Sequence, residues 1–413
     1  MKSNILNIAS VCLYFIPIAL LTGSFLPDLF VSIIALVFVY FSIAEKKWNF
    51  YINKYFTFFL IFVFYLIIVS LISEHKFHSL SSSLFYIRFG LFSLGVWYLL
   101  ESKSNVLYRF SVSMFITFIV ALIDGYIQYF FGVNIFGFKG EGVRLTLLLS
   151  DKEILGGYLS RLFPLLIGLI IISFSQNKLF LYFGFFLLIF TDVLIYITGE
   201  RTAFGLLFIS TIYVVILISK YKLFRIVTFL ISIIIIILIT LINPSIKDRN
   251  ISHTLNQIGM SDDASNMILF SEDHQNYAIT SLKIFRENIY FGTGPNTFRI
   301  SCRDENYALN NKSCNTHPHN TYLQLLSEIG LVGTIPIVFL FFMISIRSIK
   351  HLYSKVFLNK NILSDYQICL FSCFLMSLWP LLPTQNFFNN WICTVYFLPL
   401  GFYLYSINNK EEL

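Results

Sequence analysis

The chain has 413 residues, of which 57% are hydrophobic and 18% aromatic, while only 12% carry a charge. Soluble domains carry about 25% charged residues, and the mean hydropathy here is +0.75, so a soluble globular protein is excluded. The net charge of +7 does not indicate nucleic-acid binding, because lysine and arginine in a membrane protein first report orientation. The composition predicts a polytopic membrane protein of the all-α class.

Twelve apolar stretches along the chain predict membrane-spanning helices. A helix rises about 1.5 Å per residue, so about twenty apolar residues cross about 30 Å of hydrocarbon. The first stretch follows Met1 with no small-residue cleavage site, which predicts a retained span and not a removed signal peptide. The predicted spans are residues 5–22, 29–44, 55–73, 82–100, 108–131, 154–175, 179–198, 202–219, 226–242, 320–346, 364–382 and 391–407.

The connections between these spans alternate between basic segments and segments with almost no basic residue. By the positive-inside rule the basic set is cytoplasmic, which also places both termini in the cytoplasm. Long loops escape that rule, so the segments 132–153 and 243–319 are predicted to face outward. The basic set contains Lys2, Lys46, Lys47, Lys54, Lys103, Arg109, Lys178, Lys220, Lys222, Arg225, Arg347, Lys350, Lys355, Lys360 and Lys410.

This topology divides the chain into three parts. Residues 1–242 form the first nine helices, residues 243–319 form one large outer loop domain, and residues 320–413 form the last three helices. Within the loop, residues 273–287 show helical periodicity and predict an amphipathic helix on the membrane surface. Its predicted apolar stripe consists of Ala278, Leu282 and Phe285, widened by Tyr277 and Ile284.

The cysteines agree with an outward loop. Cys302 and Cys314 form a pair twelve positions apart in the large outer loop, whereas the other cysteines lie in apolar spans. An outward loop meets an oxidising compartment, where a disulfide closing so short a segment would contribute about 2–3 kcal/mol. The alternative is two free thiols.

Four arginines fall in the outer half of the membrane or just beyond it. The planar guanidinium stays charged and matches phosphate oxygens, so several converging forks would bind an anionic lipid headgroup. The alternative for each is interfacial snorkelling or pairing with a local carboxylate, such as Glu200 beside Arg201 or Glu141 near Arg144. The four residues are Arg88, Arg144, Arg161 and Arg201.

Two histidines stand where the large loop re-enters the membrane. His317 and His319 flank a proline just before the tenth span. Histidine can take and return a proton near neutral pH, which predicts a base at this position. The alternative is a hydrogen-bonding role without chemistry beside a helix cap at Asn320 or Thr316. No cluster at zinc-ligand spacing accompanies these residues, so no metal site is predicted.

These residues form a pattern that resembles a known family. His319-Asn320, followed after nine residues by Gly330-x-x-Gly333, resembles the periplasmic signature of the O-antigen ligase and polymerase superfamily. The layout of the spans around one large outer loop resembles that family too. Further similar pieces are TGERTA at 198–203, FGTGPNTFR at 291–299 and PTQNFFNNW at 383–391.

The resemblance implies a glycosyltransferase that works without metal or cofactor. Such enzymes move a glycan from undecaprenyl diphosphate to an acceptor sugar at the periplasmic face of the bacterial inner membrane, with inversion at the anomeric carbon. By this resemblance His319 is the base and Arg201 the arginine that stabilises the leaving diphosphate. The residues predicted to bind substrate are Arg88, Arg144, Arg161, Arg299, His317 and Asn320.

One family feature is missing from the sequence. The family often carries an arginine at the start of the loop helix, and that register falls here on His274-Gln275. Arg161, Arg286 and Arg299 are the candidates to replace it.

Three activities remain open from the sequence. A polymerase joins one lipid-linked repeat unit to another, whereas a ligase passes the finished chain to lipid A–core. The skew toward Phe, Ile, Asn, Lys and Tyr favours the polymerase, because AT-rich coding is typical of polysaccharide gene clusters. The third is a flippase for the same lipid-linked sugar, but no repeated halves are visible. The predicted partners are the lipid-linked donor, the acceptor glycan, membrane lipids and a chain-length regulator.

Overall fold

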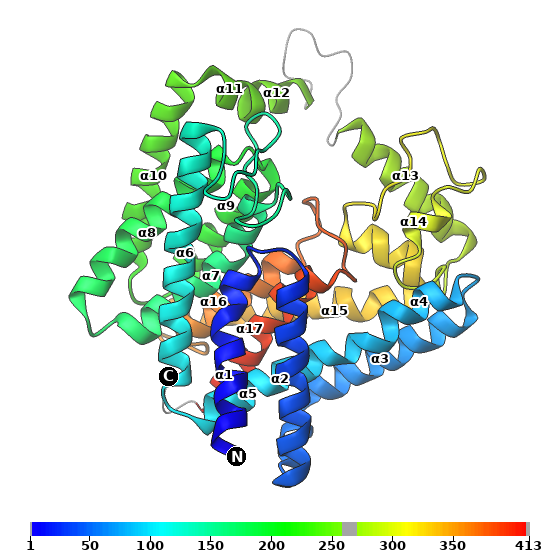
Figure 1. Ribbon diagram of the computed structural model, residues 1–413, viewed down its shortest axis with the longest axis horizontal. Helices are drawn as coiled ribbons and strands as arrows, with labels where there is room; N and C mark the ends of the chain where they lie inside the picture. Colours follow the sequence, from blue (N-terminus) through cyan, green and yellow to red (C-terminus); the bar gives the residue numbers. More distant parts are fainter. Residues whose placement is uncertain (1, 258–270, 410–413) are drawn as a thin grey trace.

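The computed structural model describes residues 2–257 and 271–409, and these residues form an all-helical protein (Figure 1). Every segment predicted to span the membrane is helical. The twelve corresponding helices are α1 (Lys2–Ala19), α2 (Phe25–Ala44), α3 (Lys54–Ile72), α5 (Ile87–Ser102), α6 (Val106–Phe131), α7 (Leu155–Phe174), α8 (Lys178–Ile197), α9 (Arg201–Leu217), α10 (Lys222–Ile242), α15 (Thr321–Phe357), α16 (Asp365–Ser377) and α17 (Asn390–Asn408).

Nine helices within the described residues are long and apolar enough to cross a membrane. One of the nine runs through α4 (Lys76–Ser83) and η2 (Leu84–Tyr86) into α5, while α9 is apolar but shorter. The predicted span 364–382 shortens to the 13 residues of α16. Pro380 follows closely, and helices end before a proline because its ring restricts the preceding residue and it offers no N–H group. The structure is therefore that of a multi-pass membrane protein.

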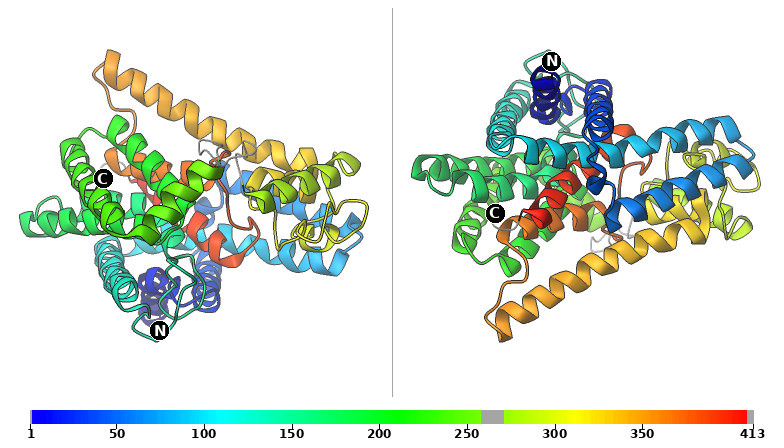
Figure 2. Two further views of the ribbon diagram at one scale, coloured as in Figure 1. Left: turned by 90° about the horizontal axis from the view of Figure 1, so that it is seen from above. Right: turned by 90° about the horizontal axis from the view of Figure 1, so that it is seen from below.

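Helix α7 lies at the centre of the bundle and is buried along nearly its whole length. It packs against α6, α8, α9 and α16. Helices α2, α5 and α17 pack together beside it, and the long helix α15 runs along one side of the molecule (Figure 2). The start of α1 and the end of α17 lie away from the short helices α11 (Pro244–Lys247) and α12 (His253–Gln257) (Figure 1).

The large loop contributes helix α13 (Glu272–Glu287), which confirms the helix predicted over 273–287. Its buried face differs from the predicted stripe. Tyr277 and Ile284 are buried as predicted, but Leu282 is exposed and Thr280 is buried instead. The reason is that α13 packs against α15, so this contact selects its buried face.

Helix α10 is apolar outside and polar inside. Its buried stripe contains Arg225, Thr228, Ser232, Ile236 and Thr240, whereas all four of its leucines and three of its isoleucines are exposed on the opposite face. This pattern is the reverse of a soluble helix. It suits a helix in lipid, because polar side chains there must find partners inside the protein.

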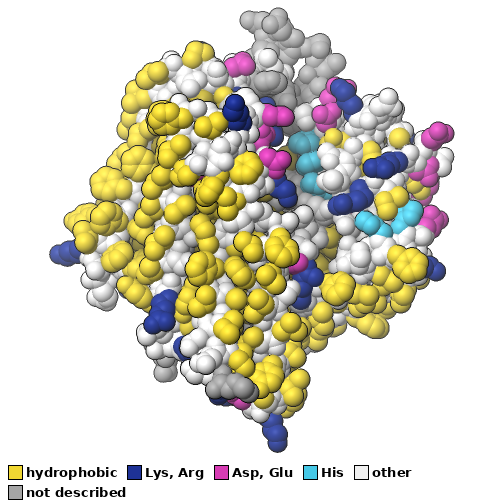
Figure 3. Space-filling model, in the orientation of Figure 1, with side chains coloured by type: hydrophobic (Ala, Val, Ile, Leu, Met, Phe, Trp, Pro, Cys, Tyr) yellow, Lys and Arg dark blue, Asp and Glu magenta, His cyan; other side chains and the backbone are white. Residues whose placement is uncertain are grey.

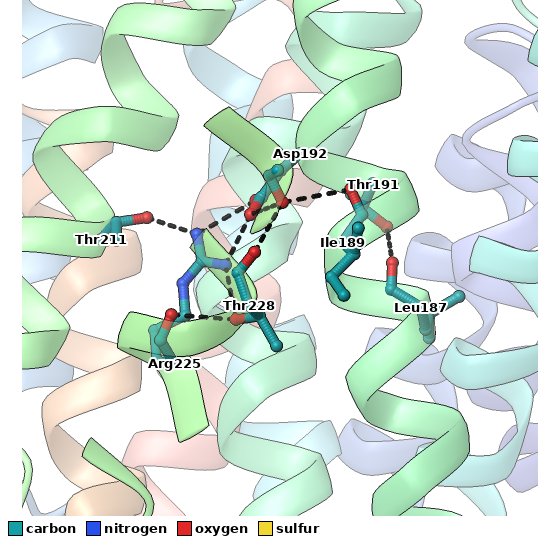
Figure 4. A network of polar contacts seen from close by, with 8 residues as sticks. Leu187, Ile189, Thr191, Asp192, Thr211, Arg225 and Thr228 are labelled. Carbon is teal, nitrogen blue, oxygen red and sulfur yellow. Dashed lines mark hydrogen bonds and ion pairs between the residues drawn. The ribbon is translucent and has the colours of Figure 1, made fainter. Parts of the chain in front are cut away.

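The partner inside the protein is Asp192 of α8 (Figure 4). Arg225 Nη1 and Nη2 donate to the two carboxylate oxygens at 2.7 and 3.0 Å, and Ser232 and Thr211 complete the network. The side chains of the pair are 2% and 0% exposed. The sequence analysis placed Arg225 among the basic residues of the cytoplasmic loops. In the structure it is a buried residue that joins α10 to α8 and α9.

Removing one partner of this pair should destabilise the protein more than removing both. Asp192→Leu leaves a buried guanidinium without its counter-ion, which is expected to cost about 3–5 kcal/mol of unfolding free energy. The double variant Asp192→Leu/Arg225→Met should lie closer to the wild type, because no charge stays unpaired. Thermal unfolding of the detergent-solubilised protein measures both. A single variant as stable as the wild type would contradict this role.

Candidate active site

A cleft opens between the part of the molecule built from α6–α12 and the part that carries α13 and α14 (Phe298–Ser301) (Figure 3). Histidine side chains appear on the α13 side of the hollow. Lysine or arginine side chains, with aspartate or glutamate, appear on the facing side. These two walls contain some of the residues that the sequence singled out, among them His317, His319, Arg144 and Arg201.

The first wall holds three imidazoles, here called the histidine cluster: His274, His317 and His319. The ring of His319 lies 4.1 Å from that of His317 and 5.0 Å from that of His274, between ring centroids. It also stacks on Tyr277 of α13 at 5.7 Å. Asn315 Nδ2 lies 3.3 Å from His319 Nε2. Because an amide nitrogen can only donate, Nε2 of His319 is the nitrogen with the lone pair.

The backbone around the cluster is fixed by the segment that precedes α17. His319 has a left-handed φ of 55°, which costs a residue with a side chain about 1–2 kcal/mol. Its carbonyl oxygen accepts from the Thr384 N–H at 2.8 Å, and His317 Nε2 donates to the Thr384 oxygen at 3.2 Å. Asn320 caps α15 and donates to the Pro380 oxygen. The segment at 383–391 therefore holds the histidines in place.

The imidazoles are held in their neutral form. Burial lowers the pKa of His319 to about 3, and the neighbouring His317 and His274 lower it further. Burial likewise lowers the pKa of His317 to about 4, with Arg299 and His274 adding to the effect. At neutral pH both rings are therefore uncharged and each has one nitrogen with a lone pair, and a proton taken up by His319 would be released readily.

The facing wall carries three guanidinium groups, here called the arginine wall: Arg144, Arg201 and Arg249. Arg201 begins α9 and its Nη1 donates to Thr254 at 3.2 Å. Arg249 Nε donates to the Gly199 oxygen, and Arg144 forms an ion pair with Glu153 at 3.4 Å. Burial lowers the pKa of Arg249, and the charges of Arg144 and Arg201 lower it further. The wall is thus a concentration of positive charge.

Arg201 also acts on the histidine cluster across the cleft. The pKa of His274 is lowered first by burial, and the charge of Arg201 lowers it further while Asp273 opposes both. His274 occupies the register where the family pattern has an arginine. The structure thus brings Arg201 toward the histidine cluster, although α9 and α13 are far apart in sequence.

Arg161 lies elsewhere, inside α7. Its side chain is buried, and Nη1 donates to the Gly157 oxygen at 3.0 Å. Its charge acts on Glu200, whose carboxylate accepts from the Gly156 and Gly157 N–H groups at the start of α7. Burial nevertheless raises the pKa of Glu200 to about 7. Arg161 is therefore part of the support under the arginine wall.

Arg88 and Arg299 line a separate polar cavity of about 420 Å³. Arg88 forms an ion pair with Asp28 of α2 at 2.6 Å, and Arg299 Nη2 donates to Asn296 at 2.9 Å. The predicted arginines thus lie in three places. Arg144 and Arg201 belong to the arginine wall, Arg161 lies beneath it in α7, and Arg88 and Arg299 line the polar cavity.

Sequence reasoning missed three residues that build the site, and Arg249 of the arginine wall is one of them. His274 was seen only as a departure from the family pattern, and its place beside His319 depends on how α13 packs on α15. Glu328, fully buried in α15, accepts from the backbone N–H groups of Asn296 and Phe298 at 2.9 Å. A glutamate within an apolar span was a signal available from the sequence, because ionisable residues there need a partner.

The predicted disulfide between Cys302 and Cys314 is present, with the two Cα atoms 5.1 Å apart. Cys302 is buried with Phe298, Ile284 and Tyr277 in a small core of the loop domain. The cross-link therefore attaches the segment that leads to the histidine cluster to the core beneath α13.

Fold and site together define a multi-pass helical membrane protein with imidazole and guanidinium groups facing each other across a cleft. A family model described as O-antigen ligase (Wzy_C) matches residues 183–338, which include Arg201 and the whole histidine cluster. The match confirms the predicted resemblance to the O-antigen ligase and polymerase superfamily. That family supports a glycosyltransferase-type function on lipid-linked glycans. No curated protein sequence matches the chain.

The histidine cluster should make the fold sensitive to acid. Its lowered pKa values mean that the unfolded chain binds protons below about pH 6.5 while the folded protein does not, so stability falls as pH falls from about 7 toward 4. The thermal unfolding midpoint should therefore drop between about pH 7.5 and 5. In the double variant His317→Gln/His319→Gln the drop should be smaller. Equal slopes in both proteins would show that these rings do not titrate as described.

Proposed function

We propose that this protein is a glycosyltransferase acting at the periplasmic face of the bacterial inner membrane. It transfers a glycan from undecaprenyl diphosphate to an acceptor sugar. The observation that supports this most is that the charge of Arg201 lies near enough to lower the pKa of His274, whose ring is 5.0 Å from that of His319 between centroids. In this proposal the protein crosses the membrane twelve times and both termini lie in the cytoplasm. Residues 243–319 form the periplasmic loop domain, and the cleft opens toward the periplasm.

The arginine wall fits the donor end of the reaction. As the anomeric carbon–oxygen bond breaks, its electron pair passes to the departing diphosphate, whose negative charge grows. Arg201, supported by Arg144 and Arg249, stabilises that charge in a partly buried site, where fixed donors act most strongly. The Arg144–Glu153 ion pair leaves a surplus of positive charge on this wall.

His319 fits the acceptor end. Its Nε2 lone pair accepts from Asn315, and the acceptor hydroxyl takes that place when it binds. The hydroxyl oxygen attacks the anomeric carbon opposite the diphosphate, which inverts that centre, and its proton passes to Nε2. Since burial keeps the pKa of His319 at about 3, the ring releases the proton to water afterwards and returns to its neutral form.

Two acceptors are consistent with this chemistry. The leading assignment is polymerase, in which the acceptor is another lipid-linked repeat unit and a chain-length regulator is a partner. The alternative is ligase, in which the acceptor is lipid A–core, and the description of the matching family favours it. Purified protein supplied with lipid-linked repeat units alone should form ladders if it is a polymerase. A product that needs added lipid A–core would identify a ligase.

The two walls should each be essential. His319→Ala removes the proton acceptor, and Arg201→Ala removes a charge-stabilising donor, a loss that typically costs about 3–4 kcal/mol of transition-state stabilisation, or a 10²–10³-fold slower reaction. Both variants should lose product formation from lipid-linked donor while eluting as folded protein on size exclusion.

Matched control variants outside the cleft are His75→Ala, ahead of α4, and Arg303→Ala, in the loop closed by the disulfide. Both should keep wild-type activity. A fully active His319→Ala would remove the proposed proton acceptor, and a fully active Arg201→Ala would remove the proposed diphosphate contact.

A further inference from the structure

The polar cavity that contains Arg88 lies outside the machinery assigned so far. Its volume of about 420 Å³ falls within the range of about 300–1,000 Å³ typical of small-molecule sites. Four segments build it: the start of α2, the α4–α5 region, the turn before α14 and the stretch before α17. The lining residues that bear on its ligand include Ser24, Asp28, Ser81, Arg88, Asn296 and Asn386.

The polar groups of this cavity are cross-linked and therefore fixed in place. Asp28 accepts from Arg88 at 2.6 Å on one oxygen and from Asn390 Nδ2 at 3.2 Å on the other. Asn296 Oδ1 accepts from both Arg299 and Asn386, at 2.9 and 3.0 Å. A preorganised set of amides, hydroxyls and one ion pair offers donors and acceptors side by side, which is what a sugar ring bearing several hydroxyls requires.

The charges that border the cavity bear on which ligand it can hold. Arg88 and Arg299 both line it, and Arg88 is paired with Asp28. The carboxylate of Asp28 faces the same space and disfavours a phosphate, so a hydroxyl-bearing ligand fits better than a diphosphate.

The cavity adjoins the histidine cluster through a short stretch of chain. Thr384 forms hydrogen bonds with His317 and His319, and Asn386, two residues further along, lines the cavity. Two residues of extended chain span about 7 Å at most. Arg299 also lines the cavity, and its charge acts on His317. The cavity therefore lies beside the histidine cluster, on the wall opposite the arginine wall.

An apolar groove of about 380 Å³ lies behind the cavity, between α3, α15, α16 and α17. It contains Tyr86 and Phe387, and the ring of Phe388, which lines the polar cavity, lies 5.9 Å from Tyr86. A polar cavity and an apolar groove thus meet at one aromatic partition. This arrangement suits an amphiphile whose sugar end lies in the first and whose lipid end lies in the second.

We propose that the polar cavity binds a sugar unit of the acceptor glycan, next to the unit whose hydroxyl reaches His319. This inference rests on the proposed transferase function. It assigns Asp28, Arg88 and Asn386 to acceptor recognition and leaves diphosphate binding to the arginine wall.

The test uses the full-length protein and a glycan without lipid or phosphate. Repeat-unit oligosaccharide, released by mild acid from the lipid-linked units of the producing cells, serves as the probe, and calorimetry measures its binding. Ser24→Trp and Ser81→Trp each place an indole into the cavity from a different wall without removing the ion pair. Ser245→Trp, an exposed serine of α11 outside the cavity, is the matched control.

The wild type and Ser245→Trp should bind the probe in a saturable manner. Ser24→Trp and Ser81→Trp should weaken that binding at least about tenfold, and inorganic diphosphate should not compete. If both tryptophan variants fold and bind as the wild type does, or if diphosphate displaces the glycan, the assignment is wrong.

His319→Ala separates this assignment from the proposed function. It should keep glycan binding while losing transfer. An active His319→Ala would contradict the proposed mechanism whatever the cavity binds. Unchanged glycan binding in the tryptophan variants would contradict only the cavity assignment.

Discussion

The site depends on a close backbone crossing between the large loop and helix α15. Residues 289–294 run against residues 327–332, joined by the hydrogen bonds Thr293 N to Ser327 O, Gly294 N to Glu328 O and Leu331 N to Ile289 O. Gly292 and Gly330 stand at the crossing with φ values of 67° and 65°. A Cβ on either would come within 2.3 Å of the opposing backbone, so only glycine fits both the conformation and the space.

The crossing is possible because α15 is broken at Gly330. Such a break frees backbone groups within a membrane helix, and these groups must be satisfied inside the protein. The loop supplies the partners, and the buried carboxylate of Glu328 adds two hydrogen bonds to the turn at 296–298. Gly292 of FGTGPNTFR and Gly330 of the Gly330-x-x-Gly333 pair are therefore the two halves of one joint. That joint places Asn296 and Arg299 at the polar cavity and α13 beside His319.

The sequence was informative wherever a property is local. Runs of about twenty apolar residues predicted the helices, Asn320 predicted a cap, and the spacing of Cys302 and Cys314 predicted the disulfide. His319 stood out because titratable rings are rare in so apolar a chain.

Pairing between distant segments was beyond that reasoning. Arg225 meets Asp192 across 33 positions, and Arg88 meets Asp28 across 60. The residues next to such an arginine in the sequence do not show whether it pairs with a carboxylate, lies in a loop or binds a substrate. The prediction of the buried face of α13 was wrong for the same reason. That face is selected by packing against α15 and not by the periodicity of α13 itself.

Positive charge in this membrane protein thus serves two purposes that the sequence does not separate. The Arg225–Asp192 pair is enclosed by side-chain partners and joins helices, whereas the arginine wall stands at a cleft opposite the histidine cluster. In the proposed function, a lipid diphosphate lies between these two walls.

The most direct test is an electron cryomicroscopy structure of the protein in nanodiscs with undecaprenyl diphosphate bound. We expect diphosphate oxygens within hydrogen-bonding distance of the Arg201 guanidinium, about 2.7–3.2 Å, with the free end of the diphosphate turned toward His319. A structure in which no diphosphate oxygen contacts the Arg201 guanidinium, although the lipid is bound elsewhere on the protein, would contradict it.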